Sequence, residues 1–324
     1  MAATSILAPD LQNPEKKALR KQFGEVLAEL GETNENLVVL DADLSCSTQT
    51  KLFADKYPER FFNQGIAEMD LVNTAAGLAT TGKVPVLSTF AMFASGKAYE
   101  AIRNTVCYSD LNVKIIPTHS GISLGEDGAS HQSIEDIALM RVIPDMTVIV
   151  PSDALETDRV VRWAIEEHQG PCYIRLVRTN WPIIHQKETH NTQWQPYKME
   201  VLREGQDLTL VATGETVYHA LLAAEALERE HGKSVEVLNS PFIKPFDKDT
   251  LIQSAQKTGR VITIESHSVI GGLGGVVCET LSEHHPTKVT RLGTQDRFGQ
   301  SGTANDLFKE YGIDWESIVQ AALQ

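Results

Sequence analysis

Glu68 is the first residue whose type and position could support chemistry. It follows a glycine turn at Gly65 and opens a segment whose apolar residues recur at helical spacing up to Gly82. A carboxylate at the mouth of an apolar helix can stabilise the helix dipole, or it can be a functional acid held in an apolar wall. Spacing alone favours the dipole interpretation.

A long polar loop, residues 119–132 (HSGISLGEDGASHQ), is the second candidate. It follows a predicted strand at 112–118 and is too long and too rich in titratable groups for a simple connection. A metal could bind there, because the loop contains two histidines and two acids, but their spacing matches no established ligand pattern. We therefore predict a polar substrate loop. The possible metal ligands in this loop are His119, Glu126, Asp127 and His131.

Three further features each allow both a functional and a structural interpretation. Phe90 and Phe93 are three residues apart and share a face on a helical turn, where such pairs usually belong to a core. Arg178 follows a predicted strand at 172–177 and could grip a phosphate or be a surface charge. The glycines at 271–275 invite a dinucleotide site, but Val277 stands where that fingerprint needs glycine, so tight packing is favoured.

The elements that must position these residues are continuous apolar strands alternating with helices. Such strands indicate a parallel sheet covered on both faces, and ligands bind just past their carboxyl ends. Asp43, Ser45 and Ser47 fit that position after a strand at 37–40. We also predict a helix from residue 13 to 31, opened by Pro14 and ended by a glycine, and a capping box at residues 133–136.

A second unit follows a predicted linker at 179–206. Its strands are expected at 208–212, 235–238, 261–265 and 288–292, with helices between them and two short helices at 303–323. The sequence thus predicts an α/β fold of two successive doubly wound sheet domains, at residues 1–190 and 191–324.

Composition narrows the function. The formal net charge is −14 over 324 residues, which argues against nucleic acid and anionic membranes as partners. An anionic small substrate would need a local basic pocket. No apolar run approaches the roughly 20 residues of a membrane helix, and the start lacks the order of a secretory signal. Four cysteines without a CxxC pair predict reduced thiols in or near the core of a cytoplasmic protein.

Three motifs together resemble the transketolase family: FNQGIAE at 62–68, STFAMF at 88–93 and the 119–132 loop. The resemblance covers nearly the whole chain but only the second half of the family, its pyrimidine-binding and C-terminal domains. It implies thiamine diphosphate bound between two domains, with the diphosphate and Mg²⁺ or a similar divalent ion on the other domain. That domain's Gly-Asp-Gly and Asn-Asn signature is missing. The chain therefore resembles the carboxyl-terminal subunit of a split transketolase, which implies a partner chain and a heterotetramer.

The resemblance also implies roles for individual residues. Glu68 aligns with the glutamate that hydrogen-bonds the cofactor's pyrimidine nitrogen, for which it must stay protonated near pH 7. Phe93 aligns with the stacking aromatic, Phe90 with its neighbour, and Asp43 with an acid near the thiazolium ring. Gly96 stands where the family has a third aromatic, which leaves one pocket wall in doubt.

The remaining roles concern the sugar substrates. His131 aligns with a histidine near the donor carbonyl, and Asp127 with an acid that reads the hydroxyl beside the acceptor carbonyl. The residues that align with the family's sugar-phosphate clamp are Arg20, Ser47, His119 and Arg178. The resemblance thus implies transfer of a two-carbon ketol unit between sugar phosphates.

Three alternatives remain. Half of a 1-deoxyxylulose-5-phosphate synthase is disfavoured because its strand before the glycine loop tends to end in Asp-Arg, whereas here it ends in Thr118-His119-Ser120. The beta subunit of a 2-oxo-acid dehydrogenase lacks the Gly-Glu-Asp-Gly loop. A non-catalytic regulatory homologue is disfavoured because the three catalytic positions are retained, although the departure at Gly96 weakly favours it.

Overall fold

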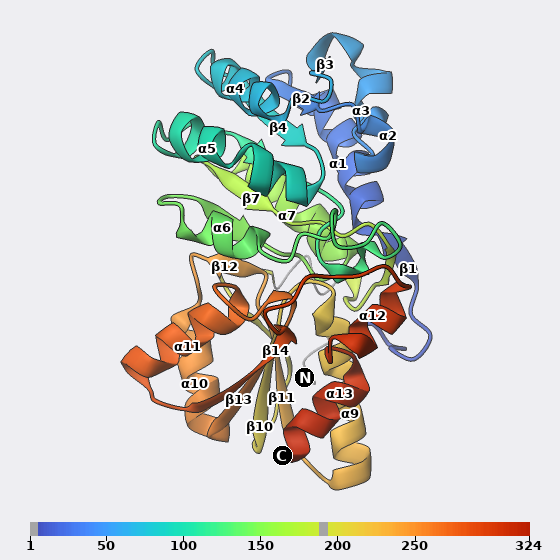
Figure 1. The fold of residues 1–324 in the computed structure, drawn as a ribbon, viewed down its shortest axis with the longest axis vertical. Coiled ribbons are helices and arrows are strands. Elements are labelled where there is room, and N and C mark those ends of the chain that lie inside the picture. Colours follow the sequence, from blue (N-terminus) through green and yellow to red (C-terminus); the bar gives the residue numbers. More distant parts are fainter. Residues whose placement is uncertain (1–5, 188–193) are drawn as a thin grey trace.

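The computed structural model describes residues 6–187 and 194–324 and contains two stacked α/β units (Figure 1). The first is built on a seven-stranded sheet in the order β12-β6-β7-β5-β4-β2-β3, the second on a five-stranded sheet in the order β14-β13-β10-β11-β9. This confirms the predicted fold class of two successive sheet domains. The strands of the first sheet are β2 Leu37–Asp41, β3 Phe61–Asn63, β4 Val84–Ser88, β5 Lys114–Ile115, β6 Thr147–Ile149, β7 Cys172–Ile174 and β12 Phe242–Lys244.

The first sheet is parallel except for β12 and is buried between two helical layers. One face packs on α1 (Leu19–Thr33), α3 (Lys51–Lys56) and α7 (Ala154–Glu166). The other packs on α4 (Glu68–Ala79), α5 (Tyr99–Ala101) and α6 (Asp136–Val142). Figure 1 shows these layers on the two sides of the upper sheet. Cover on both faces explains why the strands are continuously apolar.

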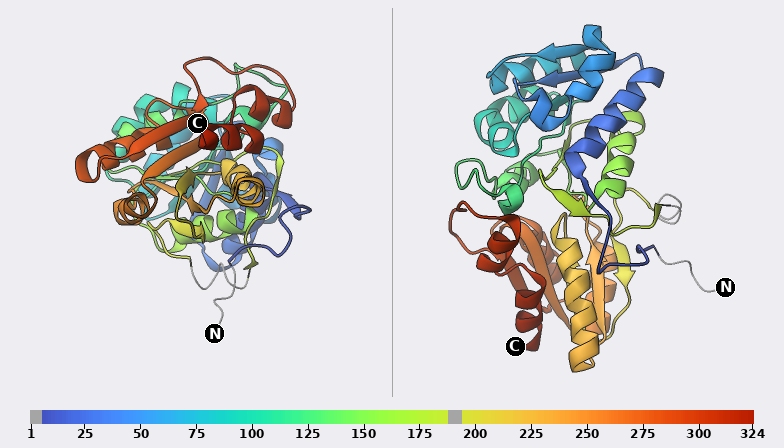
Figure 2. Two further views of the ribbon diagram at one scale, coloured as in Figure 1. Left: turned by 90° about the horizontal axis from the view of Figure 1, so that it is seen from below. Right: turned by 90° about the vertical axis from the view of Figure 1, so that its right-hand side faces the viewer.

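The second sheet is also covered on both faces. It comprises β10 Leu208–Ala212, β11 Val235–Asn239, β13 Arg260–Ser268 and β14 Lys288–Thr294, all parallel, with β9 Glu200–Arg203 antiparallel at one edge. Helices α9 (Thr216–His231) and α13 (Trp315–Leu323) cover one face, and α10 (Lys248–Thr258) and α11 (Leu273–His284) the other. The right-hand view of Figure 2 shows this unit stacked end to end on the first.

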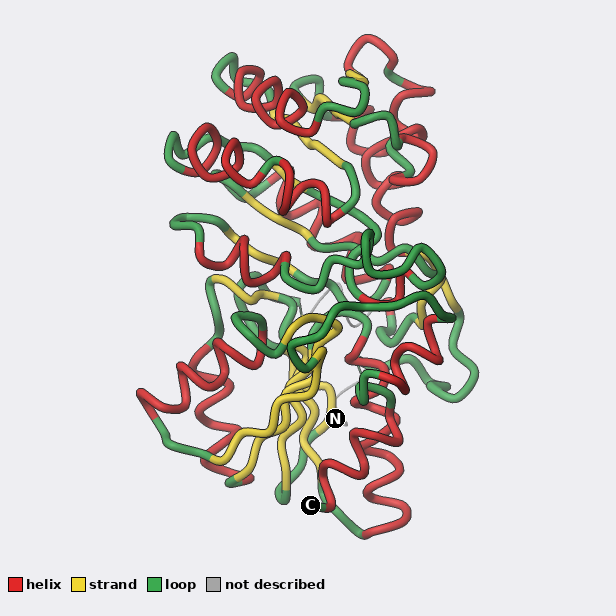
Figure 3. The backbone as a smooth tube through the Cα atoms, viewed as in Figure 1, coloured by secondary structure: helices red, strands yellow, loops and turns green. Residues whose placement is uncertain are grey.

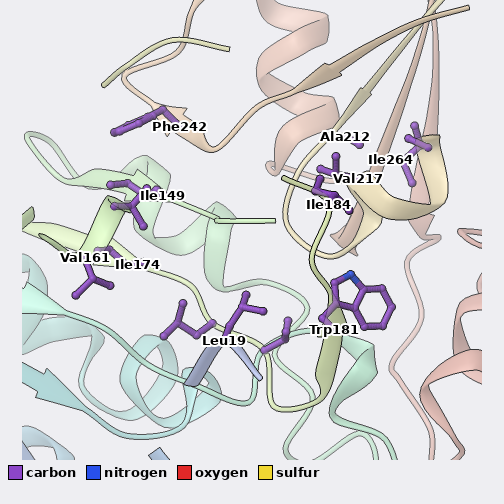
Figure 4. Packing of buried hydrophobic residues seen from close by; sticks show 14 of the residues in the cluster. Leu19, Ile149, Val161, Ile174, Trp181, Ile184, Ala212, Val217, Phe242 and Ile264 are labelled. Atoms are coloured by element: carbon purple, nitrogen blue, oxygen red, sulfur yellow. The ribbon is translucent and has the colours of Figure 1, made fainter. Parts of the chain in front are cut away.

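The two units share structure at their junction. Strand β12 comes from the second unit in sequence but pairs with β6 at the edge of the first sheet. Figure 4 shows one apolar cluster crossing the boundary, with Leu19, Ile149 and Ile174 on one side and Ala212 and Val217 on the other. The predicted division between residues 190 and 191 lies outside the described residues and stays a prediction.

Two predictions about the amino-terminal helix are wrong. Helix α1 begins at Leu19 rather than near Pro14, because residues 16–18 form β1 (Lys16–Ala18) and pair with β8 (Asn180–Pro182). It ends at Thr33 rather than Gly31. Gly31 lacks a side chain for another reason, since a Cβ there would lie 2.3 Å from the ring of Tyr57.

Three smaller predictions also need correction. The capping box at 133–136 is absent, since Glu135 precedes α6 without a side-chain cap and the Asp136 carboxylate instead accepts from Tyr173 and Arg175. The predicted linker contains β8 and β9. The cysteines are unpaired, but Cys46 is exposed rather than near the core. In the described part of the chain, no helix is long and apolar enough to cross a bilayer.

Candidate functional site

The predicted site residues gather at the carboxyl edge of the first sheet. Glu68 is the first residue of α4, which follows β3; the two phenylalanines follow β4; and the 119–132 loop follows β5. Arg178 follows β7, and Ser47 lies in the short helix α2 (Ser45–Thr48) after β2. Because the strands run parallel, their carboxyl ends meet at one edge, which is where ligands bind in open α/β sheets.

Glu68 is buried, and its carboxylate contacts the ammonium group of Lys97, which also contacts the ring of Phe93. Its side chain is 7% exposed, and its Oε1 lies 3.2 Å from Nζ of Lys97. The same Nζ lies 4.5 Å from the ring centre of Phe93, within the range of a cation–π contact. The ammonium thus lies beside both the buried acid and the aromatic face.

Four rings form the centre of the site. Phe90 and Phe93 stack with their ring centres 5.6 Å apart, and His119 stacks on Phe90 at 3.9 Å. His131 meets Phe93 edge-on at 5.5 Å. The pair shares a face as its spacing indicates, but residues Phe93–Lys97 form a π-helical segment rather than an α-helix. The two loop histidines therefore join the aromatic pair in one cluster.

His119 is held uncharged. Burial, together with the nearby guanidinium groups of Arg20 and Arg178, lowers its pKa to about 3. Its Nδ1 lies 2.7 Å from the hydroxyl of Thr118. At neutral pH this side chain can exchange hydrogen bonds with a ligand, but it adds no positive charge.

Two arginines supply the local positive charge. Nε of Arg20 donates to the Arg178 carbonyl at 3.0 Å, and Nη1 donates to the Ser47 carbonyl at 2.6 Å. Nη1 of Arg178 donates to the Leu124 carbonyl and lies 3.8 Å from the Asp127 carboxylate. Three predicted clamp residues and Asp127 are therefore contiguous. Ser47 contributes its carbonyl to these contacts rather than its hydroxyl.

Asp43 lies at the same sheet edge but in its own small network. Its backbone N–H donates to Oδ1 of Asn63 at 3.0 Å, and Asn63 Nδ2 donates back to the Asp43 carboxylate at 3.3 Å. Asp43 is exposed. Within the described chain, no hydrogen bond or ion pair joins it to the other predicted site residues.

Two residues of the site carry no role in the sequence analysis. Lys97 follows Phe93 by four residues, a spacing that places two side chains on one helical face. Gln132 directly follows His131 and is only 2% exposed. Its contacts reach a distant part of the chain, so no local pattern indicates them.

The residues present suit an aromatic heterocycle better than a metal. In residues 6–187 and 194–324, no group of three or more potential ligands is placed to hold a metal ion. A buried carboxylate and a phenylalanine face that contact the same ammonium group suit an aminopyrimidine, which needs a hydrogen-bond partner at its edge and a stacking surface. The space at Gly96 is open except toward Met92, whose Cε would lie 2.9 Å from an added Cβ.

Comparisons with known proteins match both units. Residues 15–183 match the transketolase pyrimidine-binding domain, and residues 197–318 match the transketolase C-terminal domain. A putative transketolase C-terminal section from Methanocaldococcus jannaschii is 51% identical over 95% of this chain and 96% of its own length. A 6-deoxy-6-sulfo-D-fructose transketolase subunit from Clostridium sp. is 40% identical over 95% of this chain and 94% of its own length.

A solved structure and a longer sequence relative agree with these matches. A structure described as a split gene transketolase, inactive beta4 tetramer, has a TM-score of 0.85 and 47% identity, covering 94% of this chain and 97% of that one. Human transketolase is 36% identical over 97% of this chain, but the match spans only 50% of its length. The chain therefore belongs to the transketolase family and comprises its pyrimidine-binding and C-terminal domains, as the carboxyl-terminal subunits of split transketolases do.

Proposed function

We propose that this chain is one subunit of a thiamine-diphosphate-dependent transketolase that moves a two-carbon ketol unit between sugar phosphates. The observation that carries the proposal is the buried Glu68 carboxylate, which contacts the same ammonium group as the Phe93 ring, with two guanidinium groups near His119 of the ring cluster. The first pair suits an aminopyrimidine. The arginines suit a phosphate, which guanidinium groups bind in planar, paired hydrogen bonds.

Each residue has a separate task in this proposal. Glu68 holds a proton toward the pyrimidine nitrogen once Lys97 has moved away. When bound, the cofactor supplies an electron sink for the carbanion chemistry, and the protein supplies orientation. Phe93 would stack on the pyrimidine ring, with Phe90 beside it, and Asp43 would lie toward the thiazolium ring.

The sugar contacts fall to the loop and the basic residues. His131 donates to the donor sugar near its carbonyl, and Asp127 reads the hydroxyl beside the acceptor carbonyl. Neutral His119 and the Ser47 turn orient the phosphate end, and the guanidinium groups of Arg20 and Arg178 neutralise its charge. This gives an acidic protein the local positive pocket that an anionic substrate needs.

The proposal requires a second polypeptide. The diphosphate and its divalent ion are assigned to an amino-terminal transketolase subunit, and two copies of each chain are expected in the active assembly. The relative described as a beta4 tetramer is also described as inactive, which supports self-association together with a need for the partner. We place the enzyme in the cytoplasm and in pentose phosphate metabolism.

The deciding experiment is reconstitution. The chain is mixed with a candidate amino-terminal subunit, thiamine diphosphate and Mg²⁺, and then assayed with xylulose 5-phosphate and ribose 5-phosphate. Ketol transfer by the mixture, with neither chain active alone, supports the proposal. Activity of this chain alone would contradict the split organisation.

A substrate panel separates the alternatives. Pyruvate consumption with glyceraldehyde 3-phosphate would indicate a deoxyxylulose-phosphate synthase, and oxidative decarboxylation of a 2-oxo acid would indicate a dehydrogenase subunit. Sulfonated and branched sugars belong in the panel, because relatives are named as transketolase subunits for 6-deoxy-6-sulfo-D-fructose and apulose 4-phosphate. Calorimetric titration showing no cofactor binding by the pair would favour a regulatory homologue.

A further inference from the structure

Gln132 joins the 119–132 loop to the second unit. Its Nε2 lies 3.1 Å from the Ile122 carbonyl, 3.0 Å from the Gln300 carbonyl and 3.4 Å from the Gly125 carbonyl. A side-chain amide has two hydrogens to donate, so the two shorter contacts use both hydrogens of the Gln132 NH2 group. One buried side chain therefore binds the backbone of its own loop and the backbone between β14 and α12 (Ala304–Glu310).

The partner segment, residues 299–302, packs directly against this amide. A Cβ added to Gly299 would lie 1.8 Å from Oε1 of Gln132, and one added to Gly128 would lie 2.6 Å from Oγ of Ser301. Figure 3 shows the two loops running beside each other between the units. No side chain larger than glycine fits at position 299 unless the amide moves.

The chain is tied to the second unit just before this segment. The hydroxyl of Tyr311 donates to the Phe298 carbonyl at 2.8 Å, and Arg297 pairs with Glu310 at 2.9 Å. Helix α12 packs against the turn formed by Ile122–Leu124. The second unit thus presents a fixed surface to the loop.

The opposite side of the loop faces the candidate site. His131 lies 5.5 Å from Phe93, and Arg178 donates to the Leu124 carbonyl and lies 3.8 Å from Asp127. The backbone N–H groups of His131 and Gln132 both donate to the Gly128 carbonyl, so a shift of Gln132 moves His131 with it.

We propose that Gln132 is a positioning residue that clamps the loop bearing Asp127 and His131 to residues 299–302 of the C-terminal domain. Through this clamp the C-terminal domain sets the geometry of the substrate site. Gln132 acts by holding Asp127 and His131 in place and does not itself contact a sugar. The inference deepens the proposed function and rests on it.

The test uses the reconstituted two-chain enzyme with thiamine diphosphate and Mg²⁺. Gln132→Met keeps the volume but removes both donated hydrogen bonds, and Gly299→Ala drives a methyl group into the amide. Each change is expected to raise the KM for sugar phosphates about tenfold, since buried carbonyls lose their donors. The Kd for thiamine diphosphate stays within about twofold, because the clamp does not touch Glu68 or Phe93.

The double variant and a matched control sharpen the result. Gln132→Met with Gly299→Ala is expected to be no worse than the more damaging single change, because both break one contact. Gln295→Met is the control: the same substitution four residues before Gly299, at a side chain whose hydrogen bonds among the described residues go to the Arg291 and Gly293 carbonyls. It leaves KM unchanged. Fully additive effects would count against the clamp.

A second measurement does not depend on activity. Amide hydrogen exchange in this chain alone is expected to accelerate across residues 122–132 in Gln132→Met and Gly299→Ala, but not in Gln295→Met. Unchanged exchange together with unchanged KM would overturn the inference. If the unsubstituted pair lacks ketol transfer, the proposed function fails, and faster exchange still supports the clamp while unchanged exchange refutes it.

Discussion

The Lys97 ammonium lies where the proposed function expects the edge of the cofactor's pyrimidine ring. Its ammonium contacts both the Glu68 carboxylate and the Phe93 face. A pyrimidine ring that stacks on Phe93 and bonds to Glu68 would need the space that this ammonium fills. Cofactor binding should therefore displace Lys97.

Lys97→Met removes this competition. The lysine side chain is 54% exposed, so solvent screens the pair and its loss should tighten thiamine diphosphate binding by only about two- to fivefold. Fluorescence titration of the reconstituted pair measures the Kd, with Lys83→Met as a control at a partly exposed lysine bonded to Asn36 and the Glu35 carbonyl. Weaker cofactor binding in Lys97→Met would show that the ammonium helps to hold the cofactor instead.

Glu68→Gln tests the acid itself. The amide keeps the size and one hydrogen-bond donor but cannot exchange a proton, so kcat should fall by at least about a hundredfold. The thermal midpoint should change little, because the lost ion pair has one largely exposed partner. Ketol-transfer kinetics and a melting curve are measured on the same preparation. Unaltered kcat would remove Glu68 from the proposed chemistry.

The family resemblance, rather than local spacing, singled out most candidate residues, and several of these residues lie just after strands. Glu68, the two phenylalanines and Arg178 each follow a strand whose apolar run is easy to recognise, and parallel strands bring their ends together. Lys97 and Gln132 were missed for different physical reasons. Lys97 has the spacing that would place it beside Phe93, but a lysine is usually a solvated surface charge, whereas Gln132 acts through a backbone carbonyl 168 residues away.

At the scale of elements, long-range pairing overrides local signals. The start of α1 was misplaced because β1 finds its partner in β8, near residue 180, and extended backbone there excludes a helix. The capping box failed because the Asp136 carboxylate is bound to Arg175 at 2.8 Å. Side-chain caps form elsewhere, at Asp247 before α10 and at Asp153 before α7, where Oδ1 accepts from the Glu156 N–H while Oδ2 pairs with His185.

His219 makes the packing of α9 sensitive to acid. It is 8% exposed, lies 4.9 Å from the ring centre of Phe308 and 5.9 Å from that of Trp181, and neither ring nitrogen has a hydrogen-bond partner among the described residues. Burial lowers its pKa to about 4. Since the unfolded value is about 6.5, the folded state resists protonation. The stability of this packing is complete above pH 6.5 and is lost as the pH falls toward 4.

His219→Leu should remove that dependence. Urea unfolding at pH 7.5, 6 and 5 is expected to show the variant gaining on the unsubstituted chain by about 2 kcal/mol between pH 7.5 and pH 5, the linkage of one proton whose pKa is about 6.5 unfolded and about 4 folded. The difference arises in the unfolded state. The unfolded unsubstituted chain is stabilised when His219 binds a proton, and the leucine variant has no such group. Parallel stability curves across this range would mean that His219 is protonated in the fold.

At the scale of the molecule, the two units are expected to unfold together. Strand β12 completes the first sheet from the second unit, and Phe242 on it is 2% exposed, with its ring centre 5.5 Å from that of Trp163 in α7. The apolar cluster in Figure 4 also crosses the junction. Shared strands and a shared core couple the stabilities of neighbouring units.

A fragment of residues 1–190 therefore should not reproduce the first unit. It lacks β12, so the backbone groups of β6 that pair with that strand are left open at a sheet edge, a template for aggregation. We expect the fragment to aggregate or melt well below the full chain, and the full chain to show one calorimetric transition. Phe242→Ala in the full chain should lower that transition as a whole, by about 3–5 kcal/mol in unfolding free energy. Two separate transitions would show instead that the two sheets unfold independently. A fragment that melts cooperatively at the temperature of the intact chain would show that β12 adds little to the stability of the first sheet.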